Sequence, residues 1–179
     1  MMMAEATNHY FKHLGVSDGL SQVCIPSIYQ DELGAVWLGT TEGLNRYNGK
    51  DVKVFQPSES NHGLTNNEIN ELCGDKNGRM YIRSGNDLIK LDIYTEQFTC
   101  LRQKGVYGLF CKKDTLWVSC ADGIYYYTGQ GTELTFFARV QKGFVGRALY
   151  VDKETVWVVT RKYLVAISRE DPLRQEILL

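Results

Sequence analysis

The stretch VWLGTTEGLNRY, residues 36–47, reads as two short strands joined by a turn that contains glycine. Aromatic and branched apolar residues favour extended structure, and glycine tolerates the positive φ angles that tight turns require. The stretch therefore predicts a β-hairpin. Whether this hairpin is a structural unit or a binding feature depends on whether it recurs along the chain.

An internal repeat contains the hairpin. A shift of the chain by 44 residues, without a gap, brings equivalent residues together, namely Phe11 with Phe55, Gly19-Leu20-Ser21 with Gly63-Leu64-Thr65, Ile25 with Ile69, Asp31 with Asp75, Gly34 with Gly78 and Trp37 with Tyr81. The aromatic residue then continues at spacings of 44, 36 and 40 residues, as Trp37, Tyr81, Trp117 and Trp157. The chain therefore holds four copies of one unit.

A repeat of about 40 residues with strand-forming composition is typical of a propeller blade, a four-stranded sheet that cannot bury both faces alone. We predict an all-β chain of four four-stranded antiparallel blades, at roughly residues 23–57, 67–101, 105–138 and 145–179. In the first blade the expected strands cover residues 25–30, 35–40, 43–47 and 52–55. No segment has a sustained 3.6-residue period, so we expect almost no helix.

The segment before the first blade has its own place in the repeat. Residues 9–14 align with 53–58 and are expected to form the outer strand of a further blade, whereas residues 1–8 are expected to be disordered. Four blades and one orphan strand make an awkward ring. We therefore expect residues 9–179 to form a single partial propeller that belongs to a longer one.

Composition excludes several classes of function. With 179 residues, 44% of them hydrophobic and 23% charged, the chain is expected to fold as one domain. Its net charge of −1 argues against nucleic acid, whose binders displace counterions with a basic surface. No apolar run approaches the roughly 18–20 residues that span a bilayer, and the start of the chain lacks a signal-peptide pattern, so we expect no direct membrane contact from this chain.

Five cysteines are present, an odd number with no C-x-x-C pair. This pattern argues against a zinc ribbon and against a fully paired disulfide framework, and no disulfide is assigned from the sequence. The three histidines have no partner at metal-ligand spacing. We expect no metal site and no cofactor.

The residues of the first copy resemble the two-component regulator propeller repeat. The resemblance rests on the run SIYQDELGAVWLGTTEGLNRYNGKDVKVF (residues 27–55) and on an opening motif matched by Phe11, Leu14, Asp18, Gly19, Leu20 and Ser21. It weakens afterwards, because the second copy has YIRS (residues 81–84) where the pattern has Trp-Ile-Gly-Thr, and the third and fourth copies lose the turn glycine.

The resemblance implies more than the repeat does. Proteins of that family use such propellers in the periplasmic sensor region of bacterial hybrid two-component histidine kinases, and they typically respond to glycan breakdown products. It implies that this chain is a periplasmic, ligand-sensing propeller segment with an oligosaccharide ligand. The chain has no kinase, receiver or DNA-binding motif, so we expect any signalling output to lie outside it.

Residues that recur in every copy are best explained by structure. The aromatic series beginning at Trp37 is expected to pack between neighbouring blades. Asp31 and Asp75 are expected to accept hydrogen bonds from turn amides.

Departures from the repeat are the better candidates for a site, because a structural role should recur. Arg83 stands where the first copy has Gly39, and the loops between second and third strands share one propeller face with the connections between blades. The candidate ligand-binding residues on this face are Asn66, Arg83, Asn86, Asp87, Arg161 and Tyr163. Such polar and aromatic groups suit the hydroxyls and carboxylates of sugars.

Enzymatic function has little support in the sequence, which shows no paired carboxylates, phosphate-binding loop or nucleophile elbow, and we expect no catalytic residues. Two alternatives to ligand sensing stay open. One is a structural propeller that mediates protein contacts, since exposed blade faces favour self-association as a homodimer. The other is a propeller-fold lyase.

Overall fold

The computed structural model describes residues 12–57, 63–140 and 145–178, and these residues form four sheets of four strands each. Blade 1 contains β1 (Ser27–Gln30), β2 (Val36–Thr40), β3 (Gly43–Tyr47) and β4 (Val52–Phe55). Blade 2 contains β5 (Ile69–Gly74), β6 (Arg79–Ser84), β7 (Asp87–Asp92) and β8 (Gln97–Arg102). Blade 3 contains β9 (Val106–Lys112), β10 (Thr115–Cys120), β11 (Gly123–Tyr127) and β12 (Thr135–Ala138). Blade 4 contains β13 (Val145–Val151), β14 (Thr155–Thr160), β15 (Leu164–Ser168) and β16 (Gln175–Leu178).

In every sheet the strands follow chain order, and each pairs antiparallel with the next. The all-β class and the four four-stranded blades expected from the repeat are confirmed. Helical structure among the described residues is limited to one 3-10 turn, η1 (Val16–Asp18). The strand expected at residues 25–30 begins at Ser27, and the strands expected at 43–47 and 52–55 match β3 and β4.

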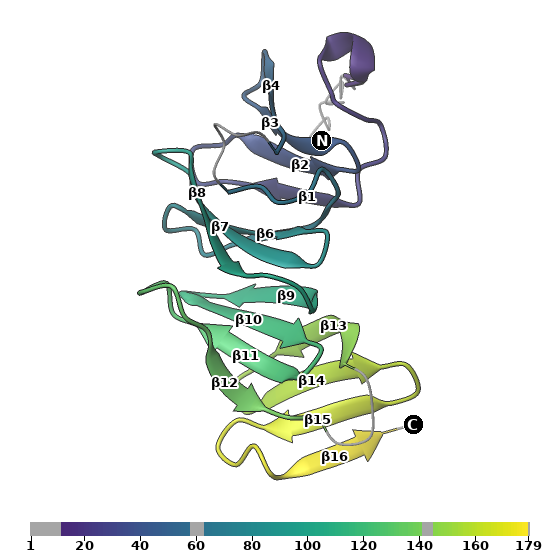
Figure 1. The fold of residues 1–179 in the computed structure, drawn as a ribbon, viewed down its shortest axis with the longest axis vertical. Coiled ribbons are helices and arrows are strands. Elements are labelled where there is room, and N and C mark those ends of the chain that lie inside the picture. The colour runs from purple at the N-terminus through teal and green to yellow at the C-terminus, as the bar shows by residue number, and fades with distance from the viewer. Residues whose placement is uncertain (1–11, 58–62, 141–144, 179) are drawn as a thin grey trace, which may run out of the picture.

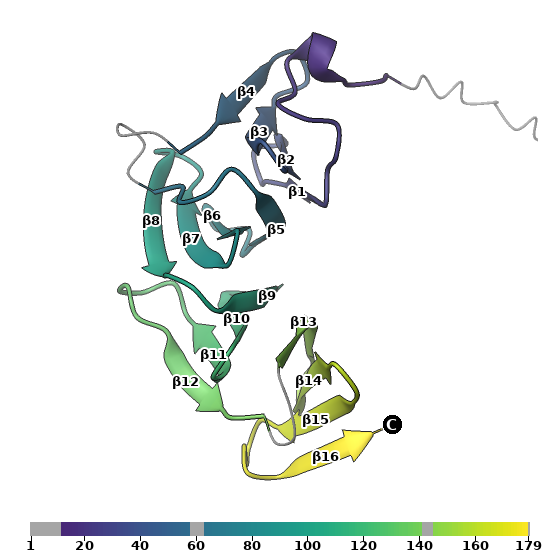
Figure 2. The same ribbon diagram turned by 45° about the vertical axis from the view of Figure 1, so that its right-hand side comes forward.

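The four blades follow one another along an arc (Figures 1 and 2). First strands of successive blades touch, β1 against β5, β5 against β9 and β9 against β13. Figure 2 shows these strands along the concave side of the arc, with β4, β8 and β12 on the convex side. The arc is open, because the first and last blades stand apart.

The turn between the first two strands of each blade is held by a side chain. Asp31 Oδ1 accepts hydrogen bonds from the amides of Leu33 and Ala35, at 3.0 and 2.9 Å. Asp75 does the same in blade 2, so the turn-capping role expected of both residues is confirmed. In blade 3 the turn has no glycine, and Lys113 takes up the positive φ of 52° instead. Such a conformation is costly for a residue with a Cβ, which explains why earlier copies use glycine there.

Three apolar clusters lie between the blades, one at each junction. Alternate residues of a strand point to opposite faces of its sheet, so each blade contributes to two junctions. The largest buried side chains of the first junction include Trp37, Ile69 and Met80; the second holds Tyr81, Leu116 and Tyr127; the third holds Trp117, Val158 and Ile167. Because no blade has a core of its own, the junctions supply the burial that stabilises the chain.

The recurring aromatic residues occupy these junctions. Trp37 and Tyr81 are fully buried and Trp117 nearly so, which confirms the packing role expected from the repeat. Trp157 is only half-buried. It lies on the face of blade 4 that, in the other three blades, packs against the next blade, and neighbouring Val159 on that face is 43% exposed.

The segment before blade 1 packs on the opposite face of that blade. Leu20 is buried, the Ser21 amide donates to Asn45 Oδ1 at 2.9 Å, and the hydroxyls of Ser21 and Thr40 are also 2.9 Å apart. The outer strand expected at residues 9–14 lies partly outside the described residues, and residues 1–8, expected to be disordered, lie wholly outside them. In the described part, residues 12–14 form no strand.

Candidate ligand-binding site

The loops between second and third strands lie at one end of the blades, together with the connections between blades. The Gly85 amide donates to the Glu68 carbonyl at 2.7 Å, and the Ala121 amide donates to the Gly105 carbonyl at 2.8 Å. The six candidate residues are at or next to these loops. The burial and the hydrogen bonds of each residue decide which of its polar groups can reach a ligand.

Arg83 is buried at the junction of blades 2 and 3, with 6% of its surface exposed. Its Nη1 donates to the Gly85 carbonyl at 3.0 Å, and its Nε lies 3.4 Å from Glu71 Oε2. The equivalent position of blade 1 is Gly39, where a Cβ would lie 2.8 Å from Ile69 Cγ2. Blades 1 and 2 therefore meet too closely at this position for a side chain. At the next junction the equivalent position holds a guanidinium.

The carboxyl group of Glu71 is the electrostatic partner of Arg83. Burial raises the pKa of Glu71 above its ordinary value, although the Leu109 backbone and the charge of Arg83 oppose the shift. The pair therefore carries a desolvation cost that its mutual attraction offsets only in part. Its placement links β5 to β6 inside the junction.

Asn66, Asn86 and Asp87 lie around the same loop of blade 2. Asn66 is exposed, and its backbone forms hydrogen bonds with Ser84 Oγ at 3.0 and 2.8 Å. Asn86 is exposed and its carbonyl accepts from the Val106 amide at 3.0 Å. Asp87 Oδ1 accepts from the Lys104 amide at 2.6 Å. The structure thus gathers these three residues and Arg83 into one group, in which Asn66 and Asn86 have exposed side chains.

Arg161 and Tyr163 belong to the equivalent loop of blade 4. Arg161 is exposed, whereas Tyr163 is half-buried against the third junction and its amide donates to Thr160 Oγ1 at 2.9 Å. Blade 3 separates this loop from the group on blade 2. The six candidates therefore form two groups on one face of the arc.

A cleft that the sequence did not reveal opens between blades 3 and 4 at the other end of the strands. It has a volume of about 470 Å³, and its lining includes Trp117, Tyr126, Phe137, Arg169 and Glu170. The Phe137 ring packs edge-on against Trp117 with ring centres 5.0 Å apart, and the Arg169 guanidinium lies 5.5 Å from the centre of the Trp117 ring. Arg169 Nη1 also donates to the carbonyls of Asp152 and Lys153, at 3.1 and 3.0 Å, which holds the guanidinium at the junction.

A second hollow of about 330 Å³ adjoins this cleft and shares Thr115, Trp117 and Arg169 with it. Its other lining residues include Lys112, Lys113 and Lys153. Lys112 Nζ donates to the Val151 carbonyl at 2.8 Å, which bridges the two blades. The two hollows together combine aromatic surface with several cations. The cations lie at three separate turns and the aromatic residues lie on strands of blade 3, and they become neighbours only when the blades pack, so no motif marks them.

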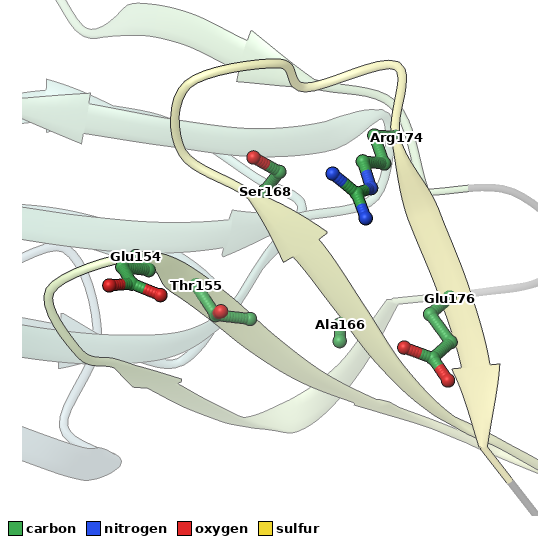
Figure 3. Close-up of a pocket in the computed structure, with 6 residues that line it drawn as sticks. All are labelled: Glu154, Thr155, Ala166, Ser168, Arg174 and Glu176. Carbon is green, nitrogen blue, oxygen red and sulfur yellow. The ribbon is translucent and has the colours of Figure 1, made fainter.

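A third pocket, of about 260 Å³, lies on the uncovered face of blade 4. Figure 3 shows the side chains that line it, which are Glu154, Thr155, Ala166, Ser168, Arg174 and Glu176. They stand on neighbouring strands around the small side chain of Ala166. The same face of each other blade packs against the next blade. This pocket is therefore part of a blade surface that no neighbouring blade covers in this structure.

The described residues contain no group of three or more His, Cys, Asp or Glu side chains arranged to hold a metal ion. Over the same ranges, no helix is long and apolar enough to cross a membrane.

Part of the first copy is similar to a known family of repeats. Residues 19–42 match the family model described as two component regulator propeller. A stretch of 55 residues is 38% identical to a histidine kinase of Formosa agariphila, and it covers 31% of this chain and 4% of the kinase.

Solved structures agree on the fold. The extracellular domain of a putative hybrid two-component system from B. thetaiotaomicron superimposes with a TM-score of 0.77 at 21% identity, covering 94% of this chain and 26% of that one. The extracellular domain of a putative one-component system from the same organism gives a TM-score of 0.73 at 18% identity, with coverages of 94% and 27%. The chain thus spans about a quarter of the length of these two domains.

Proposed function

We propose, for a chain whose first copy is a two-component regulator propeller repeat, that it is a segment of the periplasmic sensor propeller of a hybrid two-component system. The match of residues 19–42 carries this proposal, and the superposition on extracellular propellers supports it. In this role the chain binds or transmits a signal and catalyses no reaction. Any kinase output belongs to other parts of the protein.

The ligand proposed is an oligosaccharide derived from a glycan. Pyranose rings present apolar faces and hydroxyl edges, which aromatic rings and guanidinium groups bind by stacking and by paired hydrogen bonds. The cleft between blades 3 and 4 offers both, with Phe137 and Tyr126 as ring surfaces beside Trp117 and Arg169 as a donor. Its volume is in the range of small-molecule sites.

The residues on the loop face remain a second location for the ligand. Arg161, Asn66 and Asn86 are exposed there. Arg83 is engaged inside a junction, so its contribution to binding would act through the position of the loop.

Binding tests the ligand proposal. We expect at least one member of a panel of neutral and acidic oligosaccharides to raise the melting temperature of the chain and to bind in calorimetry. Arg169→Ala should weaken that binding about tenfold or more if the cleft is the site, since a charge-assisted hydrogen bond contributes about 1.5–3 kcal/mol. Arg161→Ala and Asn86→Ala test the loop face. Lys50→Ala, an exposed cation in a turn of blade 1, is the control. A panel without a single binder would contradict an oligosaccharide ligand.

A second candidate function is self-association through the uncovered face of blade 4. Tyr150 is 55% exposed on this blade, and Trp157 and Val159 lie on the face that other blades cover. Light scattering is expected to show a homodimer, and Val159→Lys is expected to weaken it. A monodisperse monomer at high concentration would rule this function out for the chain, whereas loss of the dimer with unchanged oligosaccharide affinity would separate the two functions.

A further inference from the structure

Two thiols on neighbouring blades lie against each other. Cys73 is on β5 of blade 2 and Cys111 is on β9 of blade 3, 38 positions later, and their Sγ atoms are 2.8 Å apart. Two unbonded sulfur atoms in contact stand farther apart than this, so the pair lies between van der Waals contact and a covalent bond. The strands that carry them touch along the concave side of the arc.

We propose that Cys73 and Cys111 form a disulfide that joins blade 2 to blade 3. The bond forms by thiol–disulfide exchange with an external disulfide, such as oxidised glutathione. A thiolate of the pair attacks that disulfide, one sulfur leaves as a thiolate, and the second thiolate then displaces the other. Two thiols are oxidised, two electrons reduce the external disulfide to two thiols, and the protons pass to the solvent and the leaving thiolates.

The other cysteines are placed differently. Cys24 is exposed in the segment before β1, Cys100 is half-buried on the outer strand β8, and Cys120 is buried on β10. All five cysteines are within the described residues, and the contact between Cys73 and Cys111 is the one sulfur–sulfur contact among them. Geometry therefore singles out one pair from an odd number of cysteines.

The surroundings of Cys73 favour the uncharged thiol. Burial raises the pKa of the Cys73 thiol well above its usual value, and the Cys111 thiol and the Glu71 carboxylate add to the shift. Because the thiolate is the reacting form, this thiol is slow to react when reduced. Once the bond has formed, its partly buried position slows attack by reductants on the folded chain.

A bond at this position would act on the weakest element of a repeat architecture, the junction between units. Each blade depends on its neighbours for burial, so separation of blades 2 and 3 exposes the apolar cluster that includes Tyr81 and Leu116. A covalent link between them restricts the unfolded chain over a loop of 38 residues. For a chain of this size such a link should raise the melting temperature by on the order of 10 °C.

Peptide mapping gives a direct test. Cleavage after Lys and Arg puts the five cysteines on five different peptides, residues 13–46, 54–76, 91–102, 105–112 and 114–139. The chain with Cys24→Ser, which removes the exposed thiol and its intermolecular bridges, is oxidised with glutathione disulfide, alkylated, digested and analysed by mass spectrometry without reduction. The expected product is peptide 54–76 linked to peptide 105–112. Recovery of both peptides in alkylated form, or of either linked to another cysteine, would overturn the proposal.

Thermal unfolding gives a second measurement on the same protein. A reductant should lower the melting temperature of oxidised Cys24→Ser, but should leave Cys24→Ser/Cys111→Ser unchanged. Cys24→Ser/Cys100→Ser is the matched control, because Cys100 is also half-buried and should keep the response to reductant. If the Cys111 variant does not fold, the peptide map of the Cys24→Ser chain still decides the question. Both results are independent of oligosaccharide binding, so failure of the proposed function leaves them unaffected.

Discussion

The indole Nε1 of Trp37 donates a hydrogen bond to Oδ2 of Asp31 at 2.7 Å, inside a junction where the tryptophan is fully buried. The other oxygen of Asp31 caps the preceding turn, so one carboxylate connects the turn of a blade to the aromatic residue that packs the next blade. Blade 4 repeats the relationship with Trp157 and Asp152, at 2.8 Å. In blade 2, where Tyr81 replaces tryptophan, Arg79 donates to Asp75 instead.

Removal of this carboxylate should destabilise the chain strongly. Asp31→Ala leaves the buried indole N–H and two turn amides without their acceptor, and unsatisfied buried groups cost about 1–3 kcal/mol each when water cannot replace the partner. We expect a loss of about 2–4 kcal/mol in the free energy of unfolding, measured by urea denaturation. Asp51→Ala, an exposed aspartate of the same blade, is the control and should change stability by less than about 0.5 kcal/mol. Equal stability of the two variants would refute the role of Asp31.

Removal of the Tyr81 hydroxyl, unlike removal of the Asp31 carboxylate, should not lower the stability of the chain. Its hydroxyl is buried and has no hydrogen-bond partner among the described residues. Tyr81→Phe removes an unsatisfied group and keeps the ring that packs edge-on against Tyr127. We expect this variant to be as stable as the parent chain or more stable by about 1 kcal/mol. A loss above that size would indicate a partner for the hydroxyl.

Gly39 should tolerate no side chain. A Cβ at this position would lie 2.8 Å from Ile69 Cγ2 and 3.0 Å from the Ile69 carbonyl, across the junction of blades 1 and 2. Gly39→Ala should therefore cost about 1–3 kcal/mol, because the two blades must separate to accept the methyl group. Gly15→Ala is the control, since Gly15 has a φ of −131° and the nearest atom to a Cβ there is 3.8 Å away. Similar melting temperatures for the two variants would show that the junction can adjust.

The pairing of Arg83 with Glu71 should appear as coupling between two substitutions. Arg83→Ala leaves the partly buried carboxyl group of Glu71 without its cation, for which we expect a loss of about 2–3 kcal/mol. Glu71→Gln in the same background should recover part of that loss, because it removes the uncompensated charge. A double-mutant cycle in urea measures the coupling, and additive effects would show that the two side chains act independently.

Acid should weaken the turn of blade 4 through Asp152. Hydrogen bonds from the Trp157 indole and from the amides of Glu154 and Thr155 lower the pKa of this carboxyl below its ordinary value of 3.8. A lowered pKa in the folded state means that the ionised form contributes stability above pH 3.8 and that the contribution is lost as the pH falls through the folded-state pKa. We expect Asp152→Asn to show a shallower loss of stability below about pH 4 than the parent chain.

Denaturation of the two proteins between pH 2.5 and 6 checks this expectation. Asp51→Asn is the control for the removal of one acidic group. Parallel curves for Asp152→Asn and the parent chain would contradict it.

The repeat made most of the fold predictable. Strand positions follow from local composition and from turns with Asp or Gly, and such signals survive in each copy, which is why β3 and β4 match their expected ranges. The candidate site was harder to predict. Arg83 differs from its equivalents in the sequence, but the reason is a junction that has room for a buried guanidinium paired with Glu71.

The cleft around Arg169 and Phe137 had no signal in the sequence. Its lining comes from strands of blade 3 and from a turn of blade 4, and their proximity depends on how the two sheets pack. The contact of Cys73 with Cys111 is similar, because spacing along the chain does not reveal which inner strands meet.

By itself the sequence determined the four-copy repeat, the all-β class, the antiparallel strands within each blade and the burial of Trp37, Tyr81 and Trp117, because these depend on periodicity and on short-range turn chemistry. The tertiary structure alone decided which residues meet across the junctions. Those contacts set the burial of Arg83, the cleft between blades 3 and 4, the uncovered face that holds Trp157, and the pairing of two thiols. These contacts arise because one sheet packs on another, and this packing brings together side chains that are far apart in the sequence.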